Sequence, residues 1–128
     1  MKINPKQVEA VSALPGPQRY SHFIKVAADQ RKVWGLFSEG WALYGTDDGK
    51  EAFPIWPASE YASCCNNGSW AEYQPREIDL DDLFEKLMPS LEKSKTLLAI
   101  FPTSTDKGVT PDFKLLESDI RQELSRIE

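Results

Sequence analysis

All four tryptophans of this 128-residue chain fall within positions 34–73, together with five other aromatic side chains. Aromatic rings bury a large apolar area, whereas indole N–H and phenol O–H groups require hydrogen-bond partners. Such a segment forms either the core of a small domain or the wall of a recognition site. Its members are Trp34, Trp41, Trp56 and Trp70 with Phe37, Tyr44, Phe53, Tyr61 and Tyr73. Both alternatives are compatible with the sequence.

The first part of this aromatic segment, residues 32–44, predicts a β-hairpin that turns at Glu39 and Gly40. In a tight two-residue register, Tyr44 lies across Gly35 and shields the bare backbone there; a bulged three-residue loop is the alternative. Both faces of this hairpin carry large apolar side chains. We therefore expect helices to cover one face, and a loop, a ligand or a second chain to cover the other.

A second constraint is the pair of prolines on either side of Trp56, in residues 54–57. Because each proline fixes φ and pushes the preceding residue toward extended geometry, the backbone that carries Trp56 is stiff. A short helix is predicted next, at 58–65, with Glu60 and Tyr61 near its start. Ligands often bind where a helix begins after a strand, since free backbone N–H groups collect there. Helix capping is the structural alternative.

The pattern of helices and strands predicts the fold class. Helical patterns cover residues 5–14, with Asn4 as cap, 17–31, 80–91, with a kink or a fresh start at Pro89, and 113–127; strand patterns cover 51–55, 74–78 and 96–101. This order predicts an α+β fold, with helices packed against a mainly antiparallel sheet of about four to five strands. We expect a single domain over 1–128, in which an N-terminal helix and its Pro-Gly-Pro turn (1–17) precede the main body (18–128).

Charge and hydropathy restrict the partners and the compartment. Fifteen basic and twenty acidic side chains give a net charge of −5, and the basic residues are spread along the chain. Because nucleic acids are bound by clustered Lys and Arg, we expect no nucleic-acid partner. The acidic balance instead favours a basic protein partner. The first residues form no export signal and no apolar run is long enough to span a membrane, so we expect a cytoplasmic protein without membrane contact.

No set of residues has the spacing of a catalytic site. His22, the only histidine, falls on the polar face of its predicted helix, so we expect a solvated imidazole and not a catalytic base. The adjacent Cys64 and Cys65 predict small side chains, one or both buried, and not a redox or metal site. Asp47 and Asp48 lack the spacing of a calcium loop. We therefore predict no catalytic residue, no metal site and no cofactor.

Several short segments carry a resemblance to a known family. They are residues 33–36 (Val-Trp-Gly-Leu), 40–43 (Gly-Trp-Ala-Leu), 54–57 (Pro-Ile-Trp-Pro), 70–73 (Trp-Ala-Glu-Tyr) and 101–102 (Phe-Pro), with Arg19, Tyr20 and Phe23 upstream. In this order and spacing, they resemble the small bacterial family catalogued as domain of unknown function 2750. The resemblance covers roughly positions 18–115. It implies a bacterial, cytosolic, single-domain protein, and it brings no activity, cofactor or catalytic residue with it.

Three functional hypotheses remain. The preferred one is a non-catalytic protein-interaction or accessory module that presents an aromatic surface with an acidic rim to a basic partner. The alternative is a protein that binds a small apolar or aromatic ligand in a pocket walled by Trp and Tyr. The third is an enzyme with an unrecognised pair of carboxylates. The predicted binding residues are Trp41, Trp56, Tyr61, Trp70 and Glu60. The sequence does not determine the oligomeric state.

Overall fold

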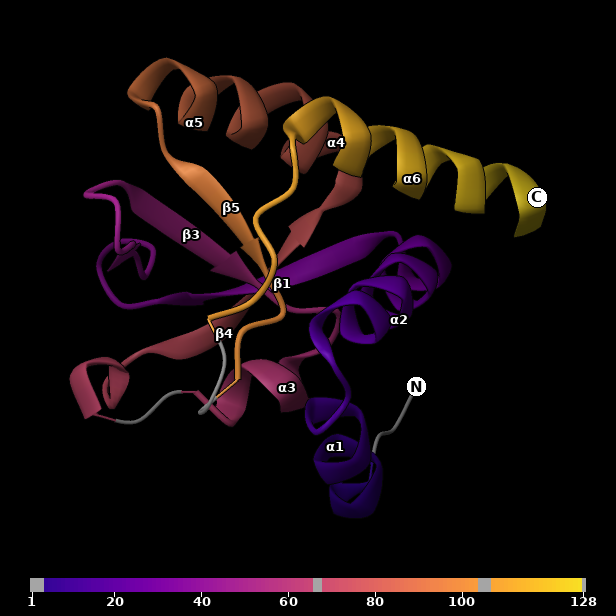
Figure 1. Ribbon diagram of the computed structural model, residues 1–128, viewed down its shortest axis with the longest axis horizontal. Coiled ribbons are helices and arrows are strands. Elements are labelled where there is room, and N and C mark those ends of the chain that lie inside the picture. Colours follow the sequence, from indigo (N-terminus) through magenta and orange to yellow (C-terminus); the bar gives the residue numbers. More distant parts are fainter. Residues whose placement is uncertain (1–3, 66–67, 104–106, 128) are drawn as a thin grey trace.

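Helices and strands follow one another largely as the sequence patterns predict, in a computed structural model that describes residues 4–65, 68–103 and 107–127 (Figure 1). The helices are α1 (Pro5–Ser12), α2 (Gly16–Gln30), α3 (Ser59–Ser63), α4 (Leu80–Asp82), α5 (Met88–Ser94) and α6 (Phe113–Ile127), with a 3₁₀ turn at Gly68–Trp70 and a π-helical turn at Leu83–Leu87. The strands are β1 (Lys32–Phe37), β2 (Tyr44–Gly45), β3 (Glu51–Ile55), β4 (Gln74–Asp79) and β5 (Leu97–Ile100). The predicted α+β fold is confirmed.

The strands form two hydrogen-bonded groups that meet at Trp56. β1 pairs with β4 in antiparallel orientation, whereas β3 pairs with β2 in antiparallel and with β5 in parallel orientation. Reciprocal backbone hydrogen bonds of 2.8 Å between Trp34 and Trp56 connect β1 to the residue that follows β3. The sheets, of two and three strands, are therefore smaller than the predicted sheet of four to five strands. The division arises because β2, only two residues long, takes the place beside the first half of β3.

The turn after β1 corrects the predicted tight hairpin. Phe37 pairs with Trp41, so residues 38–40 form a three-residue loop, which is the alternative turn. One extra loop residue changes which side chains face each other. Trp41 consequently lies over Gly35, where an added Cβ would stand 2.9 Å from the indole ring. Tyr44 does not cover Gly35; it begins β2 and pairs with β3.

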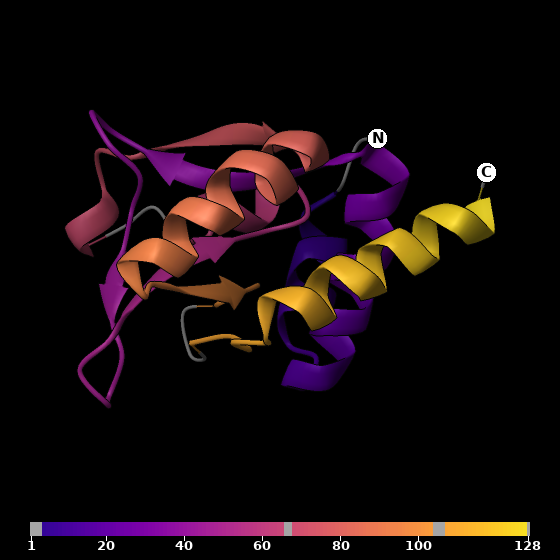
Figure 2. The ribbon, with the colours of Figure 1, turned by 90° about the horizontal axis from the view of Figure 1, so that it is seen from above.

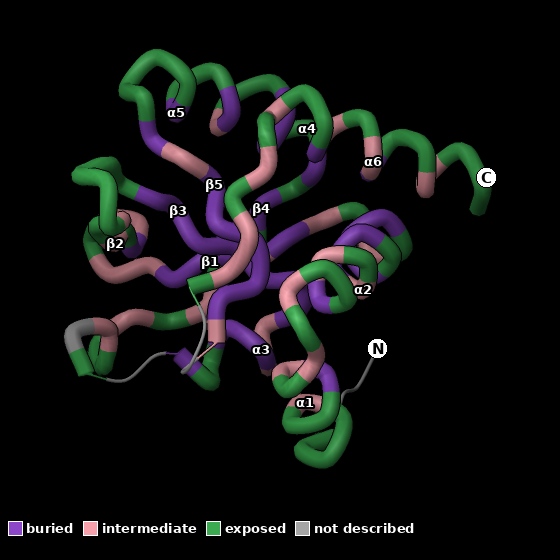
Figure 3. Tube along the Cα trace, in the orientation of Figure 1, coloured by how far each residue is buried: buried purple, intermediate pink, exposed green. Residues whose placement is uncertain are grey.

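The helices are distributed over two sides of the strands. Figures 1 and 2 show α4, α5 and α6 along one side, whereas α1 and α3 lie together at the opposite side. α2 contacts both β1 and α6. Figure 3 shows buried residues concentrated along the strands and on the helix surfaces that face them. None of the helices in the described chain combines the length and the apolar composition that a membrane crossing requires.

The sequence predicts a kink or a fresh start at Pro89; the structure instead has a π-helical turn directly before it, inside a helical stretch that runs unbroken from Leu80 to Ser94. The chain passes from α4 through the π-helical turn Leu83–Leu87 into α5, which has Pro89 in its first turn. Proline has no N–H, and its ring clashes with the carbonyl four residues earlier in a regular α-helix. The wider π-helical turn avoids this clash because its hydrogen bonds span five residues.

Most of the aromatic segment serves the interior. Trp56 and Tyr61 are among the largest fully buried side chains, and Phe53 is 3% exposed. Trp41 and Trp70 are partly buried and pack against the same core. Among the described residues, the large hydrophobic side chains that are exposed are Leu43, Leu115 and Ile127, and none of these is aromatic. Of the two alternatives for the aromatic segment, the core of the domain therefore describes most of its rings better than the wall of a recognition site.

Candidate functional site

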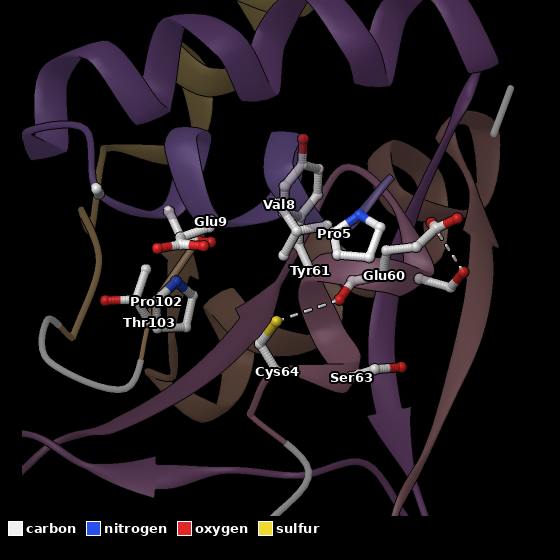
Figure 4. A pocket seen from close by; sticks show the side chains of 12 residues that line it. Pro5, Val8, Glu9, Glu60, Tyr61, Ser63, Cys64, Pro102 and Thr103 are labelled. Carbon is white, nitrogen blue, oxygen red and sulfur yellow. Dashed lines mark hydrogen bonds between the residues drawn. The ribbon is translucent and has the colours of Figure 1, made fainter. Parts of the chain in front are cut away.

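An open groove lies between α1, α3 and the segment that follows β5, and we call it the α1–α3 groove (Figure 4). Its volume is about 760 Å³. It is lined by Pro5, Val8, Glu9, Ser12, Ala13, Ser59, Glu60, Tyr61, Ser63, Cys64, Pro102 and Thr103. This volume falls in the range of about 300–1,000 Å³ that is usual for ligand sites.

The first wall of the groove is α1, which forms where its capping residues predict. The backbone N–H of Gln7 donates a 2.8 Å hydrogen bond to Oδ1 of Asn4, and Pro5 follows the cap. Val11 is buried against the body of the protein, whereas Val8 lies one helical turn earlier and lines the groove. The apolar side chains of α1 therefore serve two purposes: Val11 packs against the core, and Val8 lines the groove.

The opposite wall, at Phe101 and Pro102, has an unusual backbone. Phe101 has a φ of +57°, a conformation that side chains with a Cβ rarely adopt and that a following proline makes more unusual. Core contacts hold this wall in place. The Phe101 ring packs on Tyr61 with centroids 4.8 Å apart. The indole Nε1–H of Trp56 donates a 2.8 Å hydrogen bond to the carbonyl of Pro102, and Cys65 Sγ lies 3.5 Å from the same oxygen.

Arg19, on α2, connects the two walls. Its side chain is buried, with 3% of the residue exposed. Nη1 donates a 2.6 Å hydrogen bond to the carbonyl of Leu14, just beyond α1, and Nε donates a 3.2 Å hydrogen bond to the carbonyl of Phe101. Because a buried guanidinium must be hydrogen-bonded, these contacts fix the end of α1 relative to the Phe101 wall.

Sequence reasoning did not identify Arg19 as a residue that shapes a site. A signal is nevertheless present, since Arg19 shares helical spacing with Phe23 and Val26, which are both buried. A basic side chain within an apolar stripe indicates a buried cation with specific acceptors. The acceptors themselves are backbone carbonyls, and no residue type marks them.

The groove is apolar in its middle and acidic at its ends. Figure 4 shows Glu9 near Pro102 at one end and Glu60 at the other, with Val8 and Tyr61 between them. The described lining residues include two carboxylates and no Lys or Arg. Within the described part of the chain, neither carboxylate forms an ion pair. The groove therefore offers apolar contact together with two unneutralised negative charges.

Tyr61 links the groove to His22. The Tyr61 hydroxyl lies 3.4 Å from Nε2 of His22, and the two rings pack edge to face. The prediction of a solvated imidazole is therefore wrong: His22 is half-buried, because the Tyr61 ring packs against it. Burial, and then the positive charge of Lys25, lowers the pKa of His22. Burial also raises the pKa of Tyr61. Both groups are therefore held neutral near pH 7.

The structure distributes the five predicted binding residues over several places. Glu60 and Tyr61 line the α1–α3 groove. Trp56 is fully buried, and Trp70 packs edge to face on it with ring centroids 6.5 Å apart. Trp41 lies over β1 and lines a smaller hollow of about 400 Å³. The structure brings Glu60 and Tyr61 together and places the three tryptophans elsewhere.

The adjacent cysteines differ in exposure, which agrees with the prediction that one or both of them are buried. Cys64 is exposed and lines the groove, whereas Cys65 is buried. Burial raises the pKa of Cys64, and burial together with the neighbouring Cys64 raises the pKa of Cys65 to about 11. Across residues 4–65, 68–103 and 107–127, no three His, Cys, Asp or Glu side chains gather in a way that could hold a metal ion.

We expect iodoacetamide at pH 8 to alkylate Cys64 slowly and to leave Cys65 unmodified in the folded protein. The thiolate is the reactive species, and burial disfavours it at both positions, more so at Cys65. Peptide mapping by mass spectrometry measures the two sites separately. In urea both cysteines should react, and Cys64→Ser should remove the reaction of the folded protein. Equal labelling of both sites without denaturant would contradict this expectation.

The fold and the groove define a small α+β protein with an open site that is apolar in its middle and acidic at its ends. Residues 20–120 match the model of the family described as "Protein of unknown function (DUF2750)". The chain belongs to this family, as its tryptophan-containing segments predict. The match includes α3 and Pro102 but begins after α1, which supplies one wall of the groove. No curated protein and no solved structure matches the chain.

Proposed function

We propose that the protein is a non-catalytic binding module that takes a segment of a basic partner protein in the α1–α3 groove. The observation that carries this proposal is the combination of an apolar lining with Glu9 and Glu60 and with no basic side chain among the described lining residues. An apolar side chain of the partner would rest on Val8 and Pro5. A Lys or Arg of the partner would pair with a groove carboxylate.

The chemistry of the groove supports binding in preference to catalysis. The Cys64 thiol has a raised pKa and therefore little thiolate at neutral pH. The imidazole of His22, on α2, packs against Tyr61 of α3, and His22 is not among the residues that line the groove. A hydrolytic mechanism needs a base beside the nucleophile, and the described lining residues provide no histidine for this role.

The overall charge supports a basic partner. The chain carries a net charge of −5, and complementary charge steers association and raises the rate of encounter. Exposed charges are screened by salt, with a Debye length of about 8 Å at physiological ionic strength. Binding through the groove should therefore weaken as the salt concentration rises.

Reversing both groove charges, in Glu9→Lys with Glu60→Lys, should reduce affinity for the partner about tenfold or more, because like charges would then face each other. The tagged protein would capture partners from a lysate of the source cells, and a captured protein would be identified, purified and titrated by calorimetry. Glu39→Lys with Asp48→Lys is the matched control, since it makes the same charge change outside the groove.

The control variant should retain the affinity of the wild type, apart from a modest effect of net charge. Both variants should keep the wild-type melting temperature to within a few degrees, because the four carboxylates are exposed or partly exposed. The proposal fails if every purified partner binds the groove variant as tightly as it binds the control variant.

A small apolar or aromatic ligand in the same groove is the second candidate. The volume of about 760 Å³ favours it, because a single drug-sized molecule would fill such a space. Native mass spectrometry of the purified protein would reveal a retained ligand as an added mass. Loss of that mass after Cys64 is alkylated with a bulky maleimide would place the ligand in the groove.

We also propose that the protein works in the cytoplasm of a bacterium. The resemblance to a bacterial family supports the source and, with it, the cytoplasmic location. Cell fractionation with an antibody against the protein would test the location.

A further inference from the structure

We infer that the segment recognised by the α1–α3 groove carries two cationic side chains on either side of one apolar side chain, an inference that rests on the proposed function. An example is a Lys-x-Leu-x-Lys sequence in extended conformation. Alternate side chains of an extended chain point to the same side, so all three recognition groups would face the groove.

The placement of the two carboxylates leads to this inference. Glu9 comes from α1 and Glu60 from α3, and Figure 4 shows their carboxylates at opposite ends of the groove. The surface between them is formed by Pro5 and Val8, with the buried Tyr61 ring behind it. One cation pairs with one end only. Two cations joined through an apolar group satisfy both ends and cover the surface between them.

Both carboxylates have free capacity for a partner. Neither forms an ion pair with a described Lys or Arg. Glu9 is exposed, and Glu60 is partly buried. Oε1 of Glu60 accepts a 3.3 Å hydrogen bond from the Ser59 hydroxyl, which leaves most of its acceptor positions open. Ser59 thereby orients Glu60 without neutralising it.

The groove also offers a fixed surface for the apolar side chain of the partner segment. Arg19 and Trp56 hold the wall at Phe101 and Pro102 through hydrogen bonds to backbone carbonyls. This wall and α1 are therefore held in place before a ligand arrives. A prearranged surface reduces the ordering cost of binding, so a single leucine side chain adds measurable affinity.

The test uses ¹⁵N-labelled full-length protein and the peptide Gly-Lys-Ser-Leu-Ser-Lys-Gly, with capped ends. Titration followed by NMR gives both the affinity and the amides that are perturbed. We expect the largest shifts at Val8, Glu9, Glu60 and Cys64. Replacing either Lys of the peptide by Gln should weaken binding about twofold to fivefold, as for a partly exposed ion pair. Replacing Leu by Ser should weaken it further.

Protein variants assign each cation to one end of the groove. Each peptide in which one Lys is replaced by Gln keeps a single Lys. In Glu60→Gln, the Lys that faces position 60 no longer contributes, so the peptide that lacks this Lys should bind as tightly as the peptide with both. In Glu9→Gln, the same should hold for the peptide that lacks the Lys facing position 9. Such a pattern is a double-mutant cycle, which isolates the pairwise interaction. Glu39→Gln with Asp48→Asn is the matched control and should keep the preference for two cations.

The outcomes separate this inference from the proposed function. If Gly-Leu-Ser-Lys-Lys-Ser-Gly binds as tightly as the ordered peptide, the attraction is one of net charge and the two-cation inference is overturned. If no peptide shifts the groove amides, but a purified partner loses affinity on groove charge reversal, the two-cation inference fails and the proposed function stands. If both the peptide and the purified partner bind the groove variants as tightly as they bind the wild type, both proposals fail.

Discussion

Replacing Trp56 by alanine is expected to lower the free energy of unfolding by about 3–5 kcal/mol, the usual loss for a buried aromatic side chain. The ring is 0% exposed, and its removal leaves a cavity between β3, Trp70 and the Pro102 segment. The variant also loses the hydrogen bond from the indole to the Pro102 carbonyl. Urea denaturation followed by circular dichroism measures the change.

A Trp56→Phe variant separates the two contributions. It keeps an aromatic ring in the core but removes the N–H donor, so its loss should be clearly smaller than that of Trp56→Ala. Trp56→Phe should still bind the partner, because the side chain does not line the groove, but more weakly than the wild type, because the Pro102 wall loses one of its hydrogen bonds. A loss below about 1 kcal/mol in Trp56→Ala would contradict the core position of this ring.

The second large effect is expected for Arg19→Met, which keeps the apolar length of the side chain and removes the guanidinium donors. The carbonyls of Leu14 and Phe101 then lose their charged partner. Hydrogen bonds to charged groups contribute about 1.5–3 kcal/mol each, so we expect the loss of these two to cost about 3–6 kcal/mol. Hydrogen exchange should also accelerate in α1 more than in β1 and β3, because Arg19 holds the end of α1.

Lys25→Met is the matched control for Arg19→Met. Lys25 lies on the same helix but is exposed, so its replacement should change stability by no more than about 0.5 kcal/mol. Amide exchange in α1 should be the same as in the wild type. If Arg19→Met left the exchange of α1 unchanged, Arg19 would not be the link between the two groove walls.

Local signals predicted most of the individual elements. The sequence predicts a second helix at 17–31, which forms at Gly16–Gln30, and a last helix at 113–127, which forms at Phe113–Ile127. Both predictions depend on 3.6-residue periodicity and on prolines, which act through neighbouring residues. The cap at Asn4 and the irregular helical turn before Pro89 have the same local origin.

The pairing of strands was predicted less well, because it depends on residues that are distant in sequence. The loop at 38–40 contains one residue more than the tight hairpin, and this difference placed Trp41, not Tyr44, over Gly35. The parallel pairing of β3 with β5 has no local signal. Its apolar residues are equally compatible with other positions inside a sheet.

The candidate site was only partly predictable for the same reason. Glu60 and Tyr61 were identified because a helix start after a strand is a common binding position, and they do line the groove. The other two walls come from α1 and from Pro102, which tertiary packing brings together. The sequence also predicts the tryptophans as binding residues, yet burial of a large apolar ring is most favourable in the core, where Trp56 lies.

The central position of β3 has a consequence for biosynthesis. Its partner β2 precedes it in the chain, but its parallel partner β5 follows far later, with Ala52 beside Leu97 and Ile55 beside Ile100. While the ribosome is still adding residues, β3 therefore emerges with one edge unpaired, and such edges recruit strands from other molecules. The nascent chain depends on rapid completion of its last third, and a chain interrupted before β5 would leave this edge open to aggregation.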